Sequence, residues 1–205
     1  MKKNQVILIG GIPGVGKTSI SGYLAWKLGI DIVMSGDYLR EFLRPFSSDL
    51  NMGIMEMSVY DAWQKFGERT HENIVRGFME QGKIMNTGTN RILKRSIQNG
   101  EPLIIETLYF LPSQMDSDII GKITSFYIHI SDRNVNAERL IDRKRFTHFN
   151  SPGERLAGKL DEYRMMMERS LDECRTYGIR VFDNLNYEET RKLILEYVMN
   201  QEGEI

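Results

Sequence analysis

VILIGGIPGVGKT, the segment Val6–Thr18, joins a strand pattern directly to a phosphate-binding pattern. Its first five residues are apolar or glycine, which is typical of a strand buried on both faces of a sheet. Gly11–Thr18 then fits G-x-x-x-x-G-K-[ST] at every fixed position. A helix is predicted over Lys17–Leu28. The pattern therefore lies between a strand and a helix, which is where a phosphate-binding loop (P-loop) is found.

The residue types in this loop suit the phosphates of a nucleotide. Glycines let successive backbone N–H groups turn inward without Cβ clashes, and the N-terminus of the following helix adds partial positive charge. Lys17 is expected to reach the β- and γ-phosphates, and the Thr18 hydroxyl to bind Mg²⁺. The cofactors predicted are ATP and Mg²⁺. The cofactor-binding residues predicted in this loop are Gly11, Ile12, Pro13, Gly14, Val15, Gly16, Lys17, Thr18 and Ser19.

Short apolar segments alternate with helical segments along the rest of the chain. Further strands, buried in the sheet, are predicted at Ile32–Met34, Leu103–Glu106, Ser125–Ile130 and Ile179–Phe182. Helices are predicted at Asp37–Arg44, at 58–99 with a break near 86–88, at 132–144, from Ser151 to Gly178, and at Tyr187–Met199. The alternation predicts an α/β fold, a five-stranded parallel sheet flanked by helices, in a single domain over residues 1–205. Ligands of such sheets bind at the carboxyl ends of the strands.

Composition excludes several classes of partner. The net charge of −1 gives no electrostatic case for nucleic acid or for a membrane surface. The N-terminal apolar run is too short for a signal peptide or a membrane span, so a cytoplasmic location is expected. The single cysteine, Cys174, excludes an intramolecular disulfide, and its place on an apolar helical stripe predicts a core thiol. A monomer and a homodimer both remain open.

Two carboxylates follow predicted strands and are candidates for work at the γ-phosphate. Asp37 lies three residues beyond Met34, and Glu106 ends the run Leu103–Glu106. Either could hold Mg²⁺, and either could accept the proton of an attacking hydroxyl. The structural alternatives are a helix N-cap for Asp37 and a salt bridge for Glu106. Asp37 is the preferred base, and both are predicted metal ligands.

Four arginines are candidates for binding anions. Arg40 and Arg44 lie one helical turn apart on the same face as Asp37, which suits a substrate that carries phosphate or carboxylate groups. Arg139 and Arg143 belong to the densest basic stretch, and they are predicted to bind the nucleotide and to neutralise the charge on the transferring phosphoryl group, respectively. A charged surface helix is the structural alternative for all four.

Four further segments, taken with the P-loop, resemble 2-phosphoglycerate kinases and their relatives. Ser35–Arg44 is similar to the D-x-[IL]-R-E-x-[LM]-R segment of that family, and Ser58–Trp63 to its S-S-Y-x-A segment. Ile105–Pro112 resembles its I-E-G-x-H-x-x-P strand end, and Arg143–Phe146 its R-x-R-F lid. The matches keep their order and cover most of the chain from residue 6 to about residue 184.

The resemblance implies a P-loop NTPase fold of the nucleoside-monophosphate-kinase-like type, with a short lid at about 143–152. It also implies transfer of the γ-phosphate of ATP to a hydroxyl of a small, anionic, phosphorylated carboxylic acid. Thr107 replaces the family's glycine and Tyr109 its histidine, both in the loop expected to line the acceptor pocket. Tyr109, Phe110 and the Met52–Met57 cluster would make this pocket more apolar. That favours the short archaeal relatives that phosphorylate mevalonate 3-phosphate over 2-phosphoglycerate kinases, with Arg40, Arg44, Glu106 and Tyr109 at the acceptor.

Other functions fit less of the sequence. A nucleotide-dependent switch or slow NTPase would also carry a P-loop, but the N-K-x-D motif of a GTPase is missing from the sequence. A nucleoside monophosphate acceptor remains open because that group of folds shares this layout. The sequence therefore predicts a small-molecule kinase whose acceptor is anionic.

Overall fold

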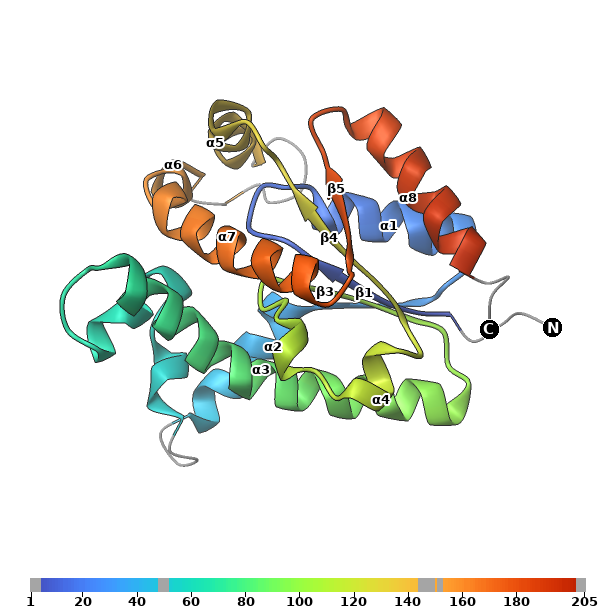
Figure 1. Ribbon diagram of the computed structural model, residues 1–205, viewed down its shortest axis with the longest axis horizontal. Helices are drawn as coiled ribbons and strands as arrows, with labels where there is room; N and C mark the ends of the chain where they lie inside the picture. The colour runs from blue at the N-terminus through green and yellow to red at the C-terminus, as the bar shows by residue number, and fades with distance from the viewer. Residues whose placement is uncertain (1–4, 48–51, 144–149, 151–152, 202–205) are drawn as a thin grey trace.

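A five-stranded parallel sheet forms the centre of the computed structural model, which describes residues 5–47, 52–143, 150 and 153–201. The strands follow the order β2-β3-β1-β4-β5, and every neighbouring pair is parallel (Figure 1). Their bounds are β1 Val6–Gly10, β2 Ile32–Ser35, β3 Leu103–Thr107, β4 Thr124–His129 and β5 Arg180–Asp183. The predicted α/β fold with a five-stranded parallel sheet is confirmed.

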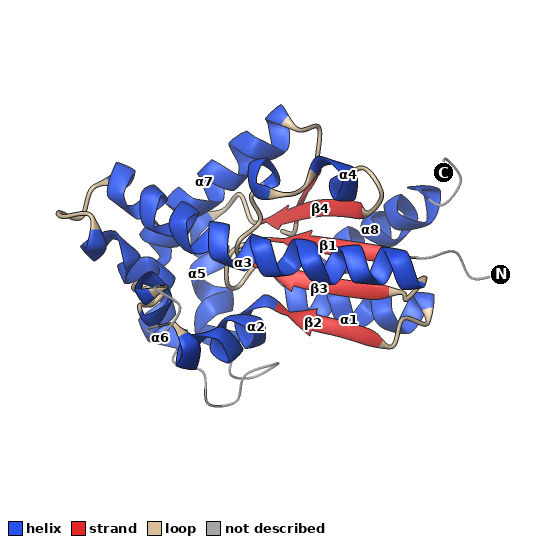
Figure 2. Cartoon of the chain, turned by 90° about the horizontal axis from the view of Figure 1, so that it is seen from below, coloured by secondary structure: helices blue, strands red, loops and turns tan. Residues whose placement is uncertain are grey.

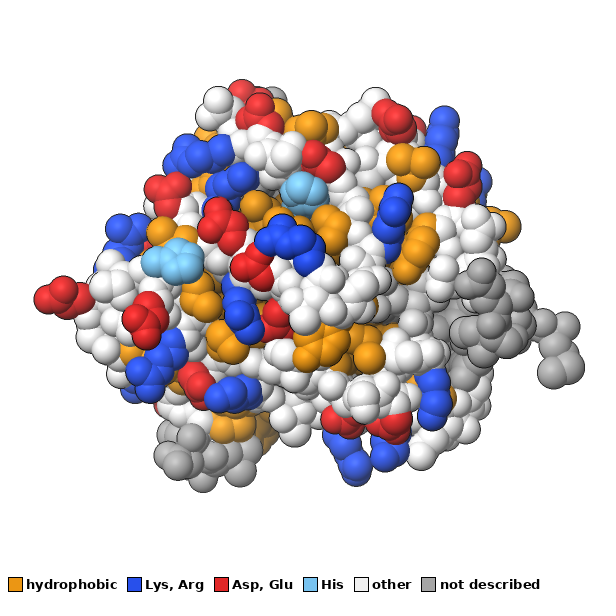
Figure 3. Space-filling view, in the orientation of Figure 1, with side chains coloured by type: hydrophobic (Ala, Val, Ile, Leu, Met, Phe, Trp, Pro, Cys, Tyr) orange, Lys and Arg blue, Asp and Glu red, His pale blue; other side chains and the backbone are white. Residues whose placement is uncertain are grey.

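Helices cover both faces of the sheet. They are α1 Lys17–Leu28, α2 Gly36–Leu43, α3 His71–Asn99, α4 Ser117–Ile120, α5 Arg133–Asp142, α6 Gly153–Ala157, α7 Leu160–Thr176 and α8 Tyr187–Gln201. Figure 2 shows α3 lying over one face, and α1 and α8 behind the sheet. All strand arrows there point toward the end where α2, α5 and α6 gather. On the face shown in Figure 3, charged side chains of both signs are interspersed with small apolar patches.

The strands differ in burial according to their place in the sheet. All five residues of β1 and all five of β3 are buried, because each strand has a neighbour on both sides and helices above and below. β2 was also expected to be buried, and this was wrong. It is an edge strand that pairs only with β3, and Ile32 and Val33 are 44% and 42% exposed.

The region 58–99 contains two elements instead of one long helix. Ser58 caps no backbone N–H, and it opens a 3₁₀ helix over Val59–Lys65. The chain then turns through Gly67, whose φ is +120°, and α3 begins after Thr70, whose hydroxyl accepts a hydrogen bond from the Asn73 N–H. The break expected near 86–88 is absent, since α3 is continuous from His71 to Asn99.

Side chains on α3 explain why its polar residues do not break it. The Asn86 amide donates to Gln114 Oε1 at 3.0 Å, and the Asn90 amide donates to the Gln114 carbonyl at 3.2 Å. These groups bond to the loop that follows β3 and so do not compete for the backbone of their own helix. Gly88 faces open space, where its missing side chain removes no packing contact.

The helix expected from Ser151 to Gly178 is divided into α6 and α7 at Gly158 and Lys159. Ser151 and Pro152, its expected start, lie outside the described residues. A Cβ on Gly153 would lie 2.6 Å from the Leu140 carbonyl oxygen, so α6 packs closely against the end of α5. Cys174 is fully buried and burial raises its pKa to about 12, as expected for a core thiol.

Two glycines of α3 offer a matched test of this packing. A Cβ on Gly77 would lie 2.8 Å from the Ala62 carbonyl carbon, whereas one on Gly88 would meet nothing within 4 Å. Both Gly→Ala changes gain the same helix propensity, about 1 kcal/mol. Overpacking against backbone should make Gly77→Ala less stable than Gly88→Ala by about 1–3 kcal/mol. Denaturant unfolding of the two variants measures this difference, and equal stabilities would contradict the described contact between the 3₁₀ helix and α3.

Candidate active site

One large cavity lies at the carboxyl ends of the strands, where the sequence placed the ligand. Its volume is about 1100 Å³, slightly more than the roughly 300–1,000 Å³ of a typical small-molecule pocket. The residues of the P-loop, α2, β3 and α5 that carry chemistry and line it are Lys17, Thr18, Asp37, Glu106, Arg139 and Arg143.

The P-loop has the backbone conformation that its glycines permit. Gly14 and Gly16 have φ values of +83° and +94°, a region that other residues rarely adopt. Gly16 is also the N-cap of α1, and no side chain caps this helix start. The first turn of α1 contains no acidic residue, so its N–H groups and partial positive charge remain available to a phosphate. Gly14 also packs closely against α5, because a Cβ on Gly14 would lie 2.8 Å from the Leu140 side chain.

The side chains of Lys17 and Thr18 have different partners in the site. The Lys17 ammonium donates to the Ile12 carbonyl at 3.1 Å, and burial lowers its pKa while the nearby carboxylates of Glu106 and Asp37 oppose that shift. The Thr18 hydroxyl lies 2.9 Å and 3.1 Å from the two carboxylate oxygens of Glu106. The side chain predicted to bind Mg²⁺ therefore sits directly against the buried acid at the tip of β3.

This pair of oxygen ligands fits a magnesium ion bound together with a nucleotide. Mg²⁺ is usually held by one or two protein side chains, with phosphate oxygens and water filling its other positions. Accordingly, no group of three or more His, Cys, Asp or Glu side chains with metal-site geometry occurs within the described part of the chain. Thr18, Glu106 and Asp37 all line the same cavity, and their role as metal ligands stays a prediction.

Asp37 is not the N-cap of α2. Ser35 occupies that position, and its hydroxyl accepts a hydrogen bond from the Asp37 N–H at 3.3 Å. Asp37 lies in the first turn of the helix and lines the cavity. The N-cap alternative for Asp37 is therefore wrong, and the Asp37 carboxylate remains a candidate for the site.

Arg40 and Arg44 make structural contacts with the segment 55–57. The Arg40 guanidinium donates to the carbonyls of Met55 and Met57, and Arg44 donates to the Glu56 carbonyl at 3.3 Å. Both also pair with Glu41. Neither is among the described residues that line the cavity. The two arginines fasten the segment 55–57 to α2, and their contact with an acceptor stays a prediction.

Tyr109 and Phe110 are packed in the core instead of lining the cavity. The Tyr109 hydroxyl donates to Gln81 Oε1 at 2.7 Å, its ring stacks on Phe78, and burial raises its pKa, so the phenol stays protonated. Phe110 fills the space beside Gly10, because a Cβ on Gly10 would lie 2.3 Å from the Phe110 Cγ atom. The residues of this loop that reach the cavity are Thr107 and Leu108. The role predicted for Tyr109 at the acceptor would therefore be indirect.

The lid arginines begin on α5. Arg139 and Arg143 both line the cavity, and the Arg139 guanidinium donates to the Leu185 carbonyl at 2.9 Å. Residues 144–149 and 151–152, which make up most of the predicted lid, lie outside the described residues. The lid itself therefore stays a prediction.

Several residues of the site carry no motif and were missed. Asn184, Tyr187 and Tyr38 line the cavity, and Asn136 contacts the P-loop from α5. The Tyr187 hydroxyl donates to the Ser19 carbonyl at 3.2 Å. Only the position of Asn184, directly after the last strand, could have suggested such a role, because the carboxyl ends of all strands meet at the same edge.

Two kinds of known kinase are similar to this chain in sequence. Over 193 residues the chain is 46% identical to Mevalonate-3-phosphate 5-kinase of Thermoplasma acidophilum, which covers 94% of this chain and 95% of that protein. This chain belongs to the mevalonate-3-phosphate 5-kinase family. 2-phosphoglycerate kinase of Pyrococcus horikoshii is 30% identical, with 100% of this chain and 67% of that protein covered. No profile of a known protein family matches the chain.

Two solved structures share the fold of this mevalonate-3-phosphate 5-kinase family member. Shikimate kinase from Acinetobacter baumannii matches with a TM-score of 0.54 at 13% identity, over 96% of this chain and 94% of that one. TT1252 from Thermus thermophilus matches with a TM-score of 0.56 at 16% identity, over 96% and 97% of the two chains. At these identities the likeness concerns the fold, and it confirms the predicted P-loop kinase architecture. In the described part of the chain, no helix is both long and apolar enough to cross a membrane.

Glu106 can be tested apart from turnover. Glu106→Gln removes the carboxylate that faces the Thr18 hydroxyl, so it should weaken binding of ADP in the presence of Mg²⁺ by about 10–100-fold. Binding without Mg²⁺ should change less. Calorimetric titration with ADP, in excess Mg²⁺ and then in a chelator, measures both. Glu101→Gln, at the opposite end of β3, is the matched control and should bind as the wild type does. An unchanged Kd for Mg-ADP in Glu106→Gln would remove this residue from the metal site.

Proposed function

We propose that this protein transfers the γ-phosphate of ATP to the 5-hydroxyl of mevalonate 3-phosphate. One observation carries the proposal: the carboxylate of Asp37 shares the P-loop cavity with Lys17. The chain that carries them matches a mevalonate-3-phosphate 5-kinase over 94% of this chain and 95% of that protein. A cytoplasmic location is part of the same proposal.

The nucleotide would be held by residues of the P-loop and its neighbours. The N–H groups of the loop and of the first turn of α1 would bind the phosphates, with Lys17 at the β- and γ-phosphates. Thr18 and Glu106 would hold Mg²⁺, whose charge offsets that of the phosphate oxygens. Arg139, beside the carbonyl of Leu185, would contact the nucleotide from α5.

Asp37 is the proposed base. Its carboxylate would accept the proton of the acceptor hydroxyl as the hydroxyl oxygen bonds to the γ-phosphorus and the bond to the β-phosphate oxygen breaks. Lys17 and Arg143 would neutralise charge on the transferring group, and both line the cavity. The charges of Asp37 and Arg143 both lie close enough to Lys17 to influence its pKa, which supports placing these two residues at one reaction centre.

Arg40 and Arg44 are proposed to bind the anionic groups of the acceptor. This contact requires their guanidinium groups to exchange carbonyls of the segment 55–57 for substrate oxygens. Movement of that segment on acceptor binding would achieve the exchange, and it would also bring the methionines at 52–57 closer to the acceptor. Tyr109 would act from beneath this segment, because Gln81, its hydrogen-bond acceptor, also donates to the carbonyls of Ile54 and Met57.

2-Phosphoglycerate is the alternative acceptor. Relatives named 2-phosphoglycerate kinase are 30% identical or less among those compared, against 46% for the mevalonate-3-phosphate 5-kinase. Both acceptors are small phosphorylated acids, so the same arginines serve either. A regulatory switch that hydrolyses ATP slowly is the alternative of another class.

A panel of acceptors distinguishes these functions. Purified protein with ATP and Mg²⁺ should release ADP rapidly with mevalonate 3-phosphate, and much more slowly with 2-phosphoglycerate, mevalonate or no acceptor. Coupled detection of ADP gives the rates, and phosphorus NMR of the product locates the new phosphate. Stimulation by 2-phosphoglycerate alone would select the alternative kinase, and no stimulation by any small acceptor would favour the switch.

Asp37→Asn tests the assigned base. The amide keeps the shape of the side chain but cannot take up the proton, so kcat should fall by about 10²–10⁴-fold with little change in the KM for ATP. Asp31→Asn, on the exposed residue just before β2, is the matched control and should retain full activity. Turnover by Asp37→Asn within a few-fold of the wild-type rate would show that another group is the base.

A further inference from the structure

Three side chains donate hydrogen bonds to carbonyls of the P-loop. The Lys17 ammonium donates to the Ile12 carbonyl at 3.1 Å. The Asn136 amide donates to the Pro13 carbonyl at 3.4 Å, and the Asn184 amide donates to the Val15 carbonyl at 2.8 Å. Lys17 is part of the motif, whereas the two asparagines come from α5 and from the residue after β5. The asparagines are not explained by the phosphate-binding motif.

The geometry of the peptide bond gives these two contacts a consequence. In a trans peptide unit the carbonyl and the N–H of the next residue point in opposite directions, and the described residues contain no cis peptide bond. Holding the Pro13 carbonyl toward Asn136 turns the Gly14 N–H the other way. Holding the Val15 carbonyl toward Asn184 does the same for the Gly16 N–H. Each amide thereby fixes the direction of one N–H group in the loop.

We propose that Asn136 and Asn184 are positioning residues that set the P-loop for the phosphate chain before a nucleotide arrives. The inference rests on the nucleotide binding of the proposed function. A cradle of this kind otherwise has to be ordered when the ligand binds, and that ordering reduces affinity. With both carbonyls held, the N–H groups of Gly14 and Gly16 are aimed in advance.

Burial shows that the two side chains are placed for this contact. Both asparagines are fully buried, and each Oδ1 atom lacks a hydrogen-bond partner in the structure. A buried amide oxygen without a donor is unfavourable for stability, so a leucine of similar size would suit the core better. The donor half of each amide is the half that is used, and in both cases it is used on the P-loop.

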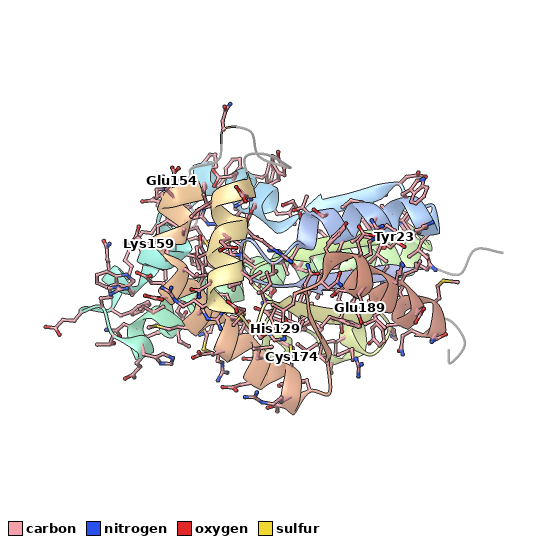
Figure 4. The ribbon with its side chains drawn as sticks, turned by 90° about the horizontal axis from the view of Figure 1, so that it is seen from above. Tyr23, His129, Glu154, Lys159, Cys174 and Glu189 are labelled. Carbon is pink, nitrogen blue, oxygen red and sulfur yellow. The ribbon has the colours of Figure 1, made fainter. Side chains whose placement is uncertain are left out.

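Both asparagine side chains pack closely against glycines of the loop. A Cβ on Gly16 would lie 2.7 Å from the Asn184 amide nitrogen, and one on Gly14 would lie 3.0 Å from that of Asn136. Asn184 is itself fixed, because its N–H donates at 2.8 Å to the carbonyl of His129, which Figure 4 labels at the end of β4. α5 carries Asn136 and also Arg139 and Arg143, so one helix fixes both the loop and the predicted base of the lid.

The test is a titration with ADP, which reads binding without turnover. Asn184→Leu removes the donor while keeping the volume, so the Kd for ADP should rise by about 10-fold, the size of one hydrogen bond. Asn136→Leu should act in the same direction and less strongly, because its contact is longer. In steady-state assays the KM for ATP should rise accordingly, while the KM for the phosphorylated acceptor stays within about twofold.

Asn134→Leu, on an exposed position of α5, is the matched control and should leave the Kd for ADP unchanged. Circular dichroism and thermal melts establish that each variant is folded. Equal ADP affinity in folded Asn184→Leu and wild type would overturn the inference alone, and so would a parallel rise in both KM values. If Asn184→Leu does not fold, Asn136→Leu decides on the same criteria. A wild-type protein that binds no ADP would instead overturn the proposed function.

Discussion

The hydrogen bonds between the Thr18 hydroxyl and the Glu106 carboxylate join the two halves of the site. Thr18 belongs to the first turn of α1. Glu106 lies in β3, the strand that pairs with β1. The contact therefore fixes the start of α1 over the tip of the sheet, and the P-loop between them has little freedom. Its energy depends on burial, because a charged acceptor shielded from water bonds more strongly than one at the surface.

Most of the fold could be predicted because its signals are local. Five apolar runs and the glycine pattern act within a few residues, so the strands and α1 agree with the sequence, as does the start of α5 near residue 132. The errors lie where distant contacts decide. The burial of β2 depends on its place at the edge of the sheet, and the continuity of α3 depends on a loop that follows β3.

The residues of the site also divide into those with a local sequence signal and those placed by distant contacts. The P-loop and the two acids were predictable, because motif and strand end lie together in sequence and the order of the sheet brings them into one cavity. Arg40 was assigned to the acceptor from its place beside the phosphate loop, and Tyr109 from the family resemblance. Their side chains bond to the carbonyl of Met55 and to Gln81, and their roles at the acceptor stay predictions. Asn136 had no local signal and Asn184 had only its place after the last strand, since their partners are more than a hundred residues away.

The register of β1 against β3 has a consequence for how the chain folds. Val6 pairs with Leu103, so the central strand pair forms only after nearly half of the chain has been brought into place. Closing so long a loop is slow, whereas a helix of the length of α3 forms from local contacts. A newly made chain therefore has its longest helix available before the sheet can assemble. Because the P-loop directly follows β1, its setting in the sheet also depends on this long-range pairing.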